Sequence, residues 1–362
     1  MTAETATLRR KTTIEHVADR AGVSISTVSR VVNSSVPVDP RTEARVRAAI
    51  AELGYRPNLL ARSFRQRITH TIGLLVPDNS NPFFAEVARA IEDAGFAAGY
   101  SVVLCNSDLS EVKQATYVDV LLAKGVDGLI LFSTGFIPPE SGLDIIARVR
   151  EAGVPCVVVD RDLGDLPIDQ VMVDNHQGGY TAGQYLLRLG HRHFACIAGL
   201  RDLTPSAGRI AGFFQALADA DVDHRDATLV SDNGRSDGGM AAAQELLRRG
   251  IDFTAVFAFN DLMAIGAIAA LQRAGRRVPA EVSVIGFDNI PQTAATFPAV
   301  TTIAQPITEL GRCSVELLLD RIERPDAPPQ RLVLSTSLVE RESCRAVGGN
   351  ATVLAKPDAR PP

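Results

Sequence analysis

The clearest pattern of apolar and polar positions lies near the start of the chain. Apolar residues within 14–21 recur at helical spacing, and Thr12 with Glu15 has the spacing of a capping box. Gly22 follows, where a tight turn needs a residue without a side chain. The pattern therefore predicts a first helix that ends in a turn at Gly22.

Two more helices are predicted directly after this turn. Ser24 can cap the second, whose valines at 28, 31 and 32 would face the first helix. Asp39 and Pro40 suit the start of a third helix, and Gly54 suits its end. The three segments together form an all-α helix-turn-helix head.

The outer face of the second helix predicts contact with DNA. Ile25, Ser26, Ser29 and Arg30 share this face, and their side chains are poor core material. Arginine can bind guanine bidentately, serine can reach phosphates or base edges, and isoleucine can meet a thymine methyl group. The plainer alternative is a three-helix bundle with a solvated polar face, because helix-turn-helix spacing alone is degenerate.

The charge distribution favours the DNA-binding alternative. Residues 1–70 hold 12 Lys and Arg against 6 Asp and Glu, whereas the rest of the chain holds 25 against 36. A head of net charge +6 thus precedes a body of net charge −11. Since phosphate contacts draw their affinity from local positive charge, the overall net charge of −5 does not argue against DNA.

From His70 onward, short apolar runs alternate with amphipathic stretches. This alternation is typical of parallel sheets covered by helices on both faces, and a break near 165–174 divides two similar halves. We therefore expect an α/β body of two doubly wound lobes. Ligands of such sheets bind beyond the carboxyl ends of the strands.

The residues that follow these apolar runs include aromatic rings, carboxylates, guanidinium groups and carboxamides, a set that suits a sugar. Each has a plainer role open to it: one of the two adjacent phenylalanines can be core, and the aspartates can cap helices. The predicted ligand-binding residues are Asn81, Phe83, Phe84, Asp160, Arg161, Arg209, Asn260, Asp288 and Gln305.

Several motifs in order carry a family resemblance: VADRAGVSISTVSRVVN, ELGYRPNLLARSF, TIGLLVPDNSNPFF, VIGFDN and TTIAQP. The chain resembles the LacI family of bacterial transcription repressors from about Thr12 to about Ser343. The resemblance implies that Ile25, Ser26 and Arg30 read bases. It also implies that Thr27, Ser29 and Asn33 hold backbone and orientation, and that a hinge helix at 57–64 contributes Asn58, Ala61 and Phe64.

The hinge can also be argued from its length. Eight residues cannot sustain an isolated helix in water, so residues 57–64 should fold only when two copies pack across a minor groove. Phe64 would then be a wedge between base pairs, where the family usually has leucine. The alternative is a plain interdomain linker with an incidental helical turn.

The resemblance implies a periplasmic-binding-protein-like body of type I and a site in the order of the ribose-binding proteins. Those proteins offer a further aromatic ring in the second lobe, and the loop 232–239 has none. The expected domains are the head at 1–56, the hinge and linker at 57–69, the first lobe at 70–169 and 305–334, the second lobe at 170–304 and 335–345, and a disordered tail at 346–362.

The function that follows is a repressor on a palindromic operator, with a ribose-like monosaccharide as inducer. The alternative is corepression by a nucleoside, a purine or a phosphorylated sugar. A homodimer is expected, because one head reads few bases and the tail from Ala346 lacks the heptads of a larger coiled-coil assembly.

Other classes of function lack their signals. The sequence has no GxGxxG, GxxxxGK[ST] or GxSxG motif, which argues against an enzyme, and we expect no catalytic residue, cofactor or metal. The five scattered cysteines predict buried thiols. No uncharged apolar run of 18 residues and no export signal is present, so we expect a cytosolic protein with no membrane partner, unlike an exported solute-binding protein.

Overall fold

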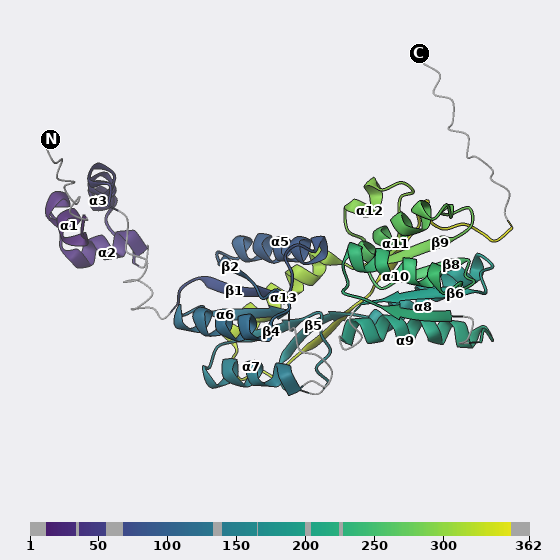
Figure 1. The fold of residues 1–362 in the computed structure, drawn as a ribbon. Coiled ribbons are helices and arrows are strands. Elements are labelled where there is room, and N and C mark those ends of the chain that lie inside the picture. The colour runs from purple at the N-terminus through teal and green to yellow at the C-terminus, as the bar shows by residue number, and fades with distance from the viewer. Residues whose placement is uncertain are drawn as a thin grey trace, which may run out of the picture. The chain divides into compact units, whose positions relative to one another are not determined.

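A computed structural model describes residues 12–33, 36–55, 68–132, 140–164, 166–199, 204–223 and 227–348 (Figure 1). The chain divides into two compact units, Met1–Thr69 and His70–Pro362. Each unit has its own hydrophobic core, so we describe them separately.

The first unit contains the three predicted helices, α1 (Ile14–Ala21), α2 (Ile25–Asn33) and α3 (Pro40–Leu53). Ser24 caps α2 by accepting a hydrogen bond from the backbone of Thr27 at 3.2 Å. Asp39 caps α3 by accepting from the backbone of Thr42 at 3.0 Å, with Pro40 in the first turn. These caps confirm the predicted boundaries of the second and third helices.

The cap of α1 corrects one expectation. The N-cap is Thr13 and its partner is His16, whose Nδ1 accepts from the backbone N–H of Thr13 at 3.1 Å. The predicted pair of Thr12 and Glu15 is therefore wrong by one position. Thr12 instead donates from its hydroxyl to the carbonyl of Leu53 at 3.2 Å, which fastens the start of α1 to the end of α3.

The core of this unit is small and made of short side chains. Gly22 has a φ of 63° between α1 and α2, the left-handed conformation that the tight turn requires. Seven residues are buried and in contact across the three helices: Val17, Ala18, Ala21, Val28, Val31, Val46 and Ala49. The turn therefore lets α2 pack on α1 while the opposite face of α2 stays in solvent.

The second unit holds two six-stranded sheets. The first lobe begins with these elements: β1 (Thr71–Val76), α5 (Pro82–Ala97), β2 (Ser101–Asn106), α6 (Glu111–Ala123), β3 (Gly128–Phe132), α7 (Glu140–Glu151), β4 (Cys156–Val159) and β5 (Asp169–Val173). The second lobe follows with α8 (Asn175–Arg188), β6 (Phe194–Ala198), α9 (Thr204–Asp219), β7 (Ala227–Ser231), α10 (Ser236–Arg248), β8 (Ala255–Ala258), α11 (Asp261–Arg273), β9 (Ser283–Asp288), α12 (Gln292–Ala295) and β10 (Thr301–Ala304). The last elements are α13 (Ile307–Glu323), β11 (Arg331–Leu334) and β12 (Ser337–Val339).

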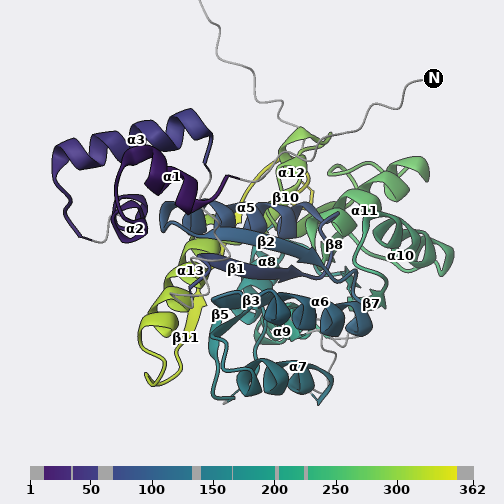
Figure 2. The ribbon, with the colours of Figure 1, turned by 90° about the vertical axis from the view of Figure 1, so that its left-hand side faces the viewer.

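The strand orders are β11-β5-β4-β3-β1-β2 and β12-β10-β9-β8-β6-β7. All pairs are parallel except β10 with β12. In the first lobe, α5 and α13 cover one face of the sheet, and α6 and α7 cover the other (Figure 2). The central strands are buried from end to end, as expected for parallel strands covered on both faces.

The chain passes between the lobes three times, at 173–175, 304–307 and 334–337. The expected lobe boundary at 169/170 falls at the start of β5, which pairs with β4 and β11 in the first sheet. The first crossover therefore follows Val173, because this strand completes the first sheet before the chain leaves it.

Two terminal expectations also meet the structure. The backbone N–H of Val347 donates to the carbonyl of Leu189 at 2.8 Å, so the expected disordered tail does not begin at 346. Residues 349–362 and the hinge residues 56–67 lie outside the described part of the chain. Within the described part, no helix is long and apolar enough to cross a bilayer.

Candidate functional site

The outer face of α2 is accessible in the first unit. Ile25 is 45% exposed, Ser26 and Arg30 are exposed, and Thr27 and Ser29 are half-buried. The hydroxyl of Ser24 lies 2.7 Å from that of Ser26 and 2.9 Å from that of Thr27. This face therefore offers an apolar side chain, a guanidinium and a line of hydroxyl groups at the start of one helix.

The remaining predicted DNA contacts cannot be placed. Asn58, Ala61 and Phe64 lie outside the described residues, and nothing is said of the side chain of Asn33. Their roles remain predictions from the sequence.

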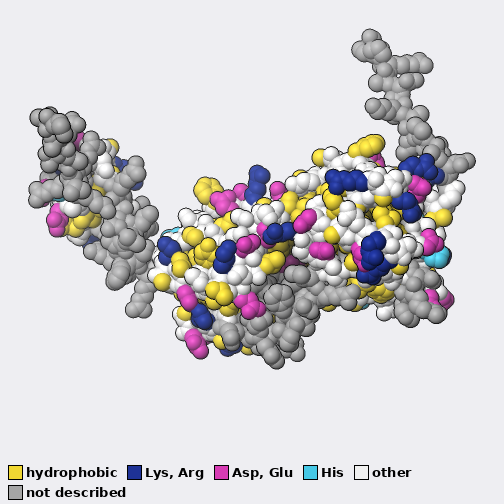
Figure 3. Space-filling model, in the orientation of Figure 1, with side chains coloured by type: hydrophobic (Ala, Val, Ile, Leu, Met, Phe, Trp, Pro, Cys, Tyr) yellow, Lys and Arg dark blue, Asp and Glu magenta, His cyan; other side chains and the backbone are white. Residues whose placement is uncertain are grey.

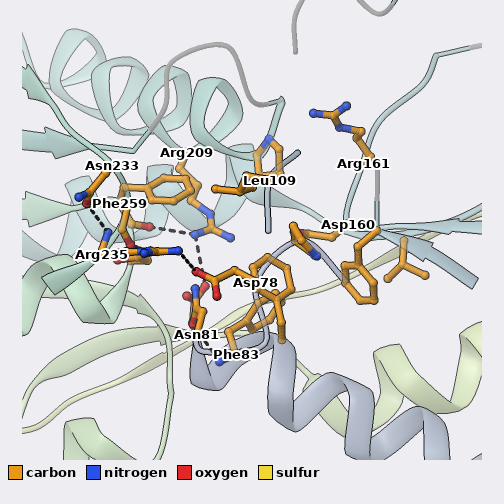
Figure 4. A pocket seen from close by; sticks show the side chains of 18 residues that line it. Asp78, Asn81, Phe83, Leu109, Asp160, Arg161, Arg209, Asn233, Arg235 and Phe259 are labelled. Carbon is orange, nitrogen blue, oxygen red and sulfur yellow. Dashed lines mark hydrogen bonds and ion pairs between the residues drawn. The ribbon is translucent and has the colours of Figure 1, made fainter. Parts of the chain in front are cut away.

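A cleft of about 870 Å³ opens in the second unit, at the carboxyl ends of strands from both sheets (Figure 4). Eight of the nine predicted ligand residues line it: Asn81, Phe83, Phe84, Asp160, Arg161, Arg209, Asn260 and Asp288. The ninth, Gln305, is 5% exposed and reaches the cleft through its bond to Asp288. The cleft volume falls in the range of small-molecule sites.

An ion pair between Arg209 and Asp288 forms one wall of the cleft. The Nη1 of Arg209 lies 3.2 Å from Oδ1 of Asp288, and the two side chains are only 3% and 5% exposed. The guanidinium also donates to Oδ1 of Asn175 at 2.7 Å and stacks on Phe287, 3.7 Å from the ring centroid. Burial raises the pKa of Asp288 to about 6, although Arg209 and Gln305 act to lower it.

Asp160 is the second carboxylate of the cleft and directly follows β4. Its backbone has a φ of 58°, a strained conformation that points to a local requirement for the side chain's position. Its Oδ1 is inaccessible and has no hydrogen-bond partner, and burial raises its pKa to about 7. Burial also lowers the pKa of the neighbouring Arg161 to about 10, against the attraction of Asp160.

The two adjacent phenylalanines divide their roles. Phe83 is 3% exposed and belongs to the core of the first lobe, whereas Phe84 is half-buried and meets Phe132 edge to face at 5.6 Å. Phe259 lines the cleft from the second lobe, 4.6 Å from the guanidinium carbon of Arg209. The expectation that the second lobe lacks a further aromatic was wrong, because the ring comes from the end of β8 rather than from the loop 232–239.

The three carboxamides are largely committed to the protein. Asn81 caps α5 by accepting from the backbone of Phe83 at 3.0 Å. Asn260 caps α11 through its Oδ1 and donates from Nδ2 to the carbonyl of Gly234 at 2.8 Å. Gln305 donates to Oδ1 of Asp288 at 2.7 Å, while its own Oε1 is buried without a partner. Gln305 thus combines a positioning role with a free acceptor.

The sequence reasoning missed two charged residues of the cleft, Asp78 and Arg235, which bind each other at 2.8 Å. Both were within reach of a sequence signal. Asp78 ends the same apolar run as Asn81, and Arg235 lies in the loop that we searched only for aromatic residues. The described residues contain no cluster of His, Cys, Asp and Glu suited to a metal ion. The five cysteines are free thiols, but Cys105 and Cys344 are only half-buried.

Comparison with known proteins assigns both units. A model of bacterial regulatory proteins of the lacI family matches residues 13–58. A model of periplasmic binding proteins and the sugar binding domain of the LacI family matches residues 69–342. The chain belongs to the LacI family. The HTH-type transcriptional repressor PurR of Pectobacterium carotovorum is 39% identical over 333 residues, which are 91% of this chain and 96% of that protein.

Two solved structures of the family are similar in fold. A LacI family regulator from Enterococcus faecium with bound ribose is 36% identical, with a TM-score of 0.70 over 76% of this chain and 99% of that one. The lac repressor dimer bound to operator and an anti-inducer is 29% identical, with a TM-score of 0.83 over 93% of this chain and 100% of that one. This LacI-family chain is thus a DNA-binding repressor with a ligand-binding body, and its relatives are repressors rather than enzymes.

Proposed function

We propose that a neutral monosaccharide, ribose-like in its pattern of hydroxyl groups, is the inducer of this repressor. The observation that carries the proposal is the pair of unpartnered acceptor oxygens, Oδ1 of Asp160 and Oε1 of Gln305. A buried acceptor without a partner costs free energy, and a sugar hydroxyl can donate a hydrogen bond to each. The ribose bound to the Enterococcus faecium regulator supports the same class of ligand.

The charge of the cleft favours a neutral ligand. Arg209 is paired with Asp288, and Arg235 is paired with Asp78, while Arg161 follows Asp160 in sequence. A phosphorylated sugar would bring about two negative charges into a cleft whose guanidinium groups already have carboxylate neighbours. The aromatic rings of Phe84 and Phe259 supply apolar surface for the C–H groups of a sugar ring.

The DNA-binding half of the proposal rests on the exposed face of α2. We infer a homodimer on a palindromic operator, in which Ile25, Ser26 and Arg30 read bases and the hinge 57–64 enters the minor groove. The basic residues are concentrated in the head, whereas acidic and basic side chains are interspersed on the visible face of the body (Figure 3). A cytoplasmic repressor of this design would meet DNA through its head.

Coupling between the two halves would pass through lobe closure. Closure changes the spacing of the two hinges in a dimer, and the free energy of folding those hinges links the effector to DNA. We favour induction, in which the sugar weakens operator binding. Corepression by a nucleoside, a purine or a phosphorylated sugar is the alternative.

The experiment has two stages. A thermal-shift screen of the full chain would compare D-ribose and other monosaccharides with nucleosides, purines and ribose 5-phosphate. DNA selected from random duplexes by the full chain would then be titrated with and without each hit. Stabilisation by a monosaccharide that lowers DNA affinity supports the proposal. Stabilisation by nucleobases or phosphorylated sugars alone, or a rise in DNA affinity, would favour corepression.

A further inference from the structure

An ion pair joins the two lobes across the cleft. Nη2 of Arg235 in the second lobe lies 2.8 Å from Oδ2 of Asp78 in the first lobe, and 3.8 Å from Oδ1 of Asp108 (Figure 4 shows the first contact). Arg235 and Asp78 are 157 residues apart in the chain and both line the cleft. Neither belongs to the predicted ligand residues.

Asp78 is held in place before Arg235 meets it. The backbone N–H and the hydroxyl of Ser80 donate to its Oδ1 at 3.0 and 2.6 Å. Oδ2 is thereby directed to the other lobe, and the side chain is 10% exposed. Burial acts to raise the pKa of Asp78, but the bonds from Ser80 and Arg235 outweigh it and lower the pKa, so the carboxylate is charged at neutral pH.

Arg235 projects from a loop that is itself fastened. Its backbone N–H donates to Oδ1 of Asn233 at 2.9 Å, directly before α10. The side chain of Asn260 holds the next turn of this loop through the carbonyl of Gly234 at 2.8 Å. Both ends of the ion pair are therefore anchored in their own lobes, so the pair is sensitive to the distance between the lobes.

The other bonds of the cleft do not report that distance. Arg209 contacts Asn175, Phe259 and Asp288, which all belong to the second lobe. The apolar contact between the lobes is made by Ile290, which follows β9, is 1% exposed and packs into the core of the first lobe. The lobes thus meet at an apolar contact and at an ionic one on the cleft wall.

We propose that Asp78 and Arg235 form a clamp that holds the lobes closed over the effector, with Asp108 as a second acceptor. The inference rests on the proposed function for the identity of the effector, but not for the closure itself. The pair must break for the lobes to part, so it slows escape of a bound effector and favours the closed state of the free protein.

The strength of the clamp follows from its exposure. The side chain of Arg235 is 49% exposed, so solvent weakens the attraction and added salt screens it. We expect Asp78→Asn or Arg235→Gln to speed effector dissociation about 3–10-fold at low ionic strength, a factor that corresponds to about 1 kcal/mol. The difference from wild type should nearly disappear at roughly 1 M salt.

The first test measures dissociation of D-ribose from the full chain by competition in a stopped-flow instrument, at low and high salt. Asn at position 78 keeps an acceptor for Ser80, so the turn survives. The double variant Asp78→Arg with Arg235→Asp should recover part of the wild-type rate. The control is Arg248→Gln, which breaks an exposed pair with Glu245 on α10 and should change nothing. Wild-type rates in both single variants would overturn the clamp.

The second test needs no effector. Hydrogen exchange of the Ile290 amide, which donates to Asp261 at 2.9 Å, reports lobe opening at a site remote from the ion pair. The two single variants should exchange there several-fold faster than wild type and the Arg248→Gln control. If D-ribose does not bind wild type, the monosaccharide proposal fails while this test still decides the clamp. Unchanged exchange at Ile290 in both variants would refute it.

Discussion

Asp160 is a residue whose position favours binding at the expense of stability. Its carboxylate is buried, its Oδ1 has no partner, and its φ of 58° is strained. Each of these properties costs stability in the absence of a ligand. A ligand hydroxyl bonded to Oδ1 would offset part of that cost, so the same side chain should oppose folding and favour binding.

Replacing Asp160 by Asn should therefore separate stability from binding. The pKa of Asp160 is raised to about 7 in the folded chain, above its usual value, so wild type loses stability as pH rises toward and through 7. The variant has no such loss, and asparagine tolerates positive φ. Its advantage in Tm should grow by a few degrees between about pH 5.5 and pH 8.

Binding should change in the opposite direction. An uncharged amide is a weaker acceptor, so D-ribose affinity should fall by about 1.5–3 kcal/mol in Asp160→Asn. Calorimetry of both proteins at pH 8 checks this. Wild-type affinity together with a higher Tm would mean that Asp160 does not contact the sugar.

Phe83 and Phe84 provide a second contrast at the scale of one residue. Phe84→Ala removes a half-buried ring from the cleft wall, so D-ribose affinity should fall by about 0.5–1.5 kcal/mol with little loss of stability. Phe83→Ala opens a cavity in the first lobe and should cost about 3–5 kcal/mol of unfolding free energy. Denaturant unfolding and calorimetry on both variants measure the two effects, and equal destabilisation would contradict this division of roles.

At the scale of elements, local rules predicted most boundaries, while contacts between elements escaped them. Ser24, Asp39 and Gly22 act where a cap or turn was expected, because each satisfies backbone groups within a few residues. The pair of Asp78 and Arg235 could not be found in this way, because it exists only once two lobes have folded and met. The place of β5 in the first sheet likewise depends on pairing with β11, a strand from the far end of the chain.

The recognition helix α2 gives a prediction for an element. Arg30→Ala should cost about 1–3 kcal/mol of affinity for selected operator DNA, because a bidentate base contact is lost. Arg30 is exposed, so folding should be unaffected. Arg45→Ala on α3 is the matched control, since it removes the same charge from another exposed position. Titrations on operator and random duplexes should show equal losses for the control and an operator-specific loss for Arg30.

At the scale of the whole molecule, one head is too small to find an operator alone. Two chains should occupy one palindromic duplex, and a half-site duplex should bind at least tenfold more weakly at the same salt concentration. Sedimentation velocity with labelled duplexes of both kinds measures stoichiometry and affinity together. One chain per palindrome at saturation would exclude the proposed homodimer.

The three crossovers between the lobes have a genetic consequence. Neither lobe is encoded by one continuous stretch, and the last strands of the two sheets, β11 and β12, come after everything else. The hydroxyl of Ser343, further on still, accepts from the backbone of Thr301 at 2.8 Å inside the second lobe. A stop codon just before Ser337 would therefore remove an edge strand and a buried bond from the second lobe, although more than nine-tenths of the reading frame is translated. Late stop codons should inactivate the repressor as fully as early ones, and recombination between family members should exchange an intact lobe only by joining the gene at several places at once.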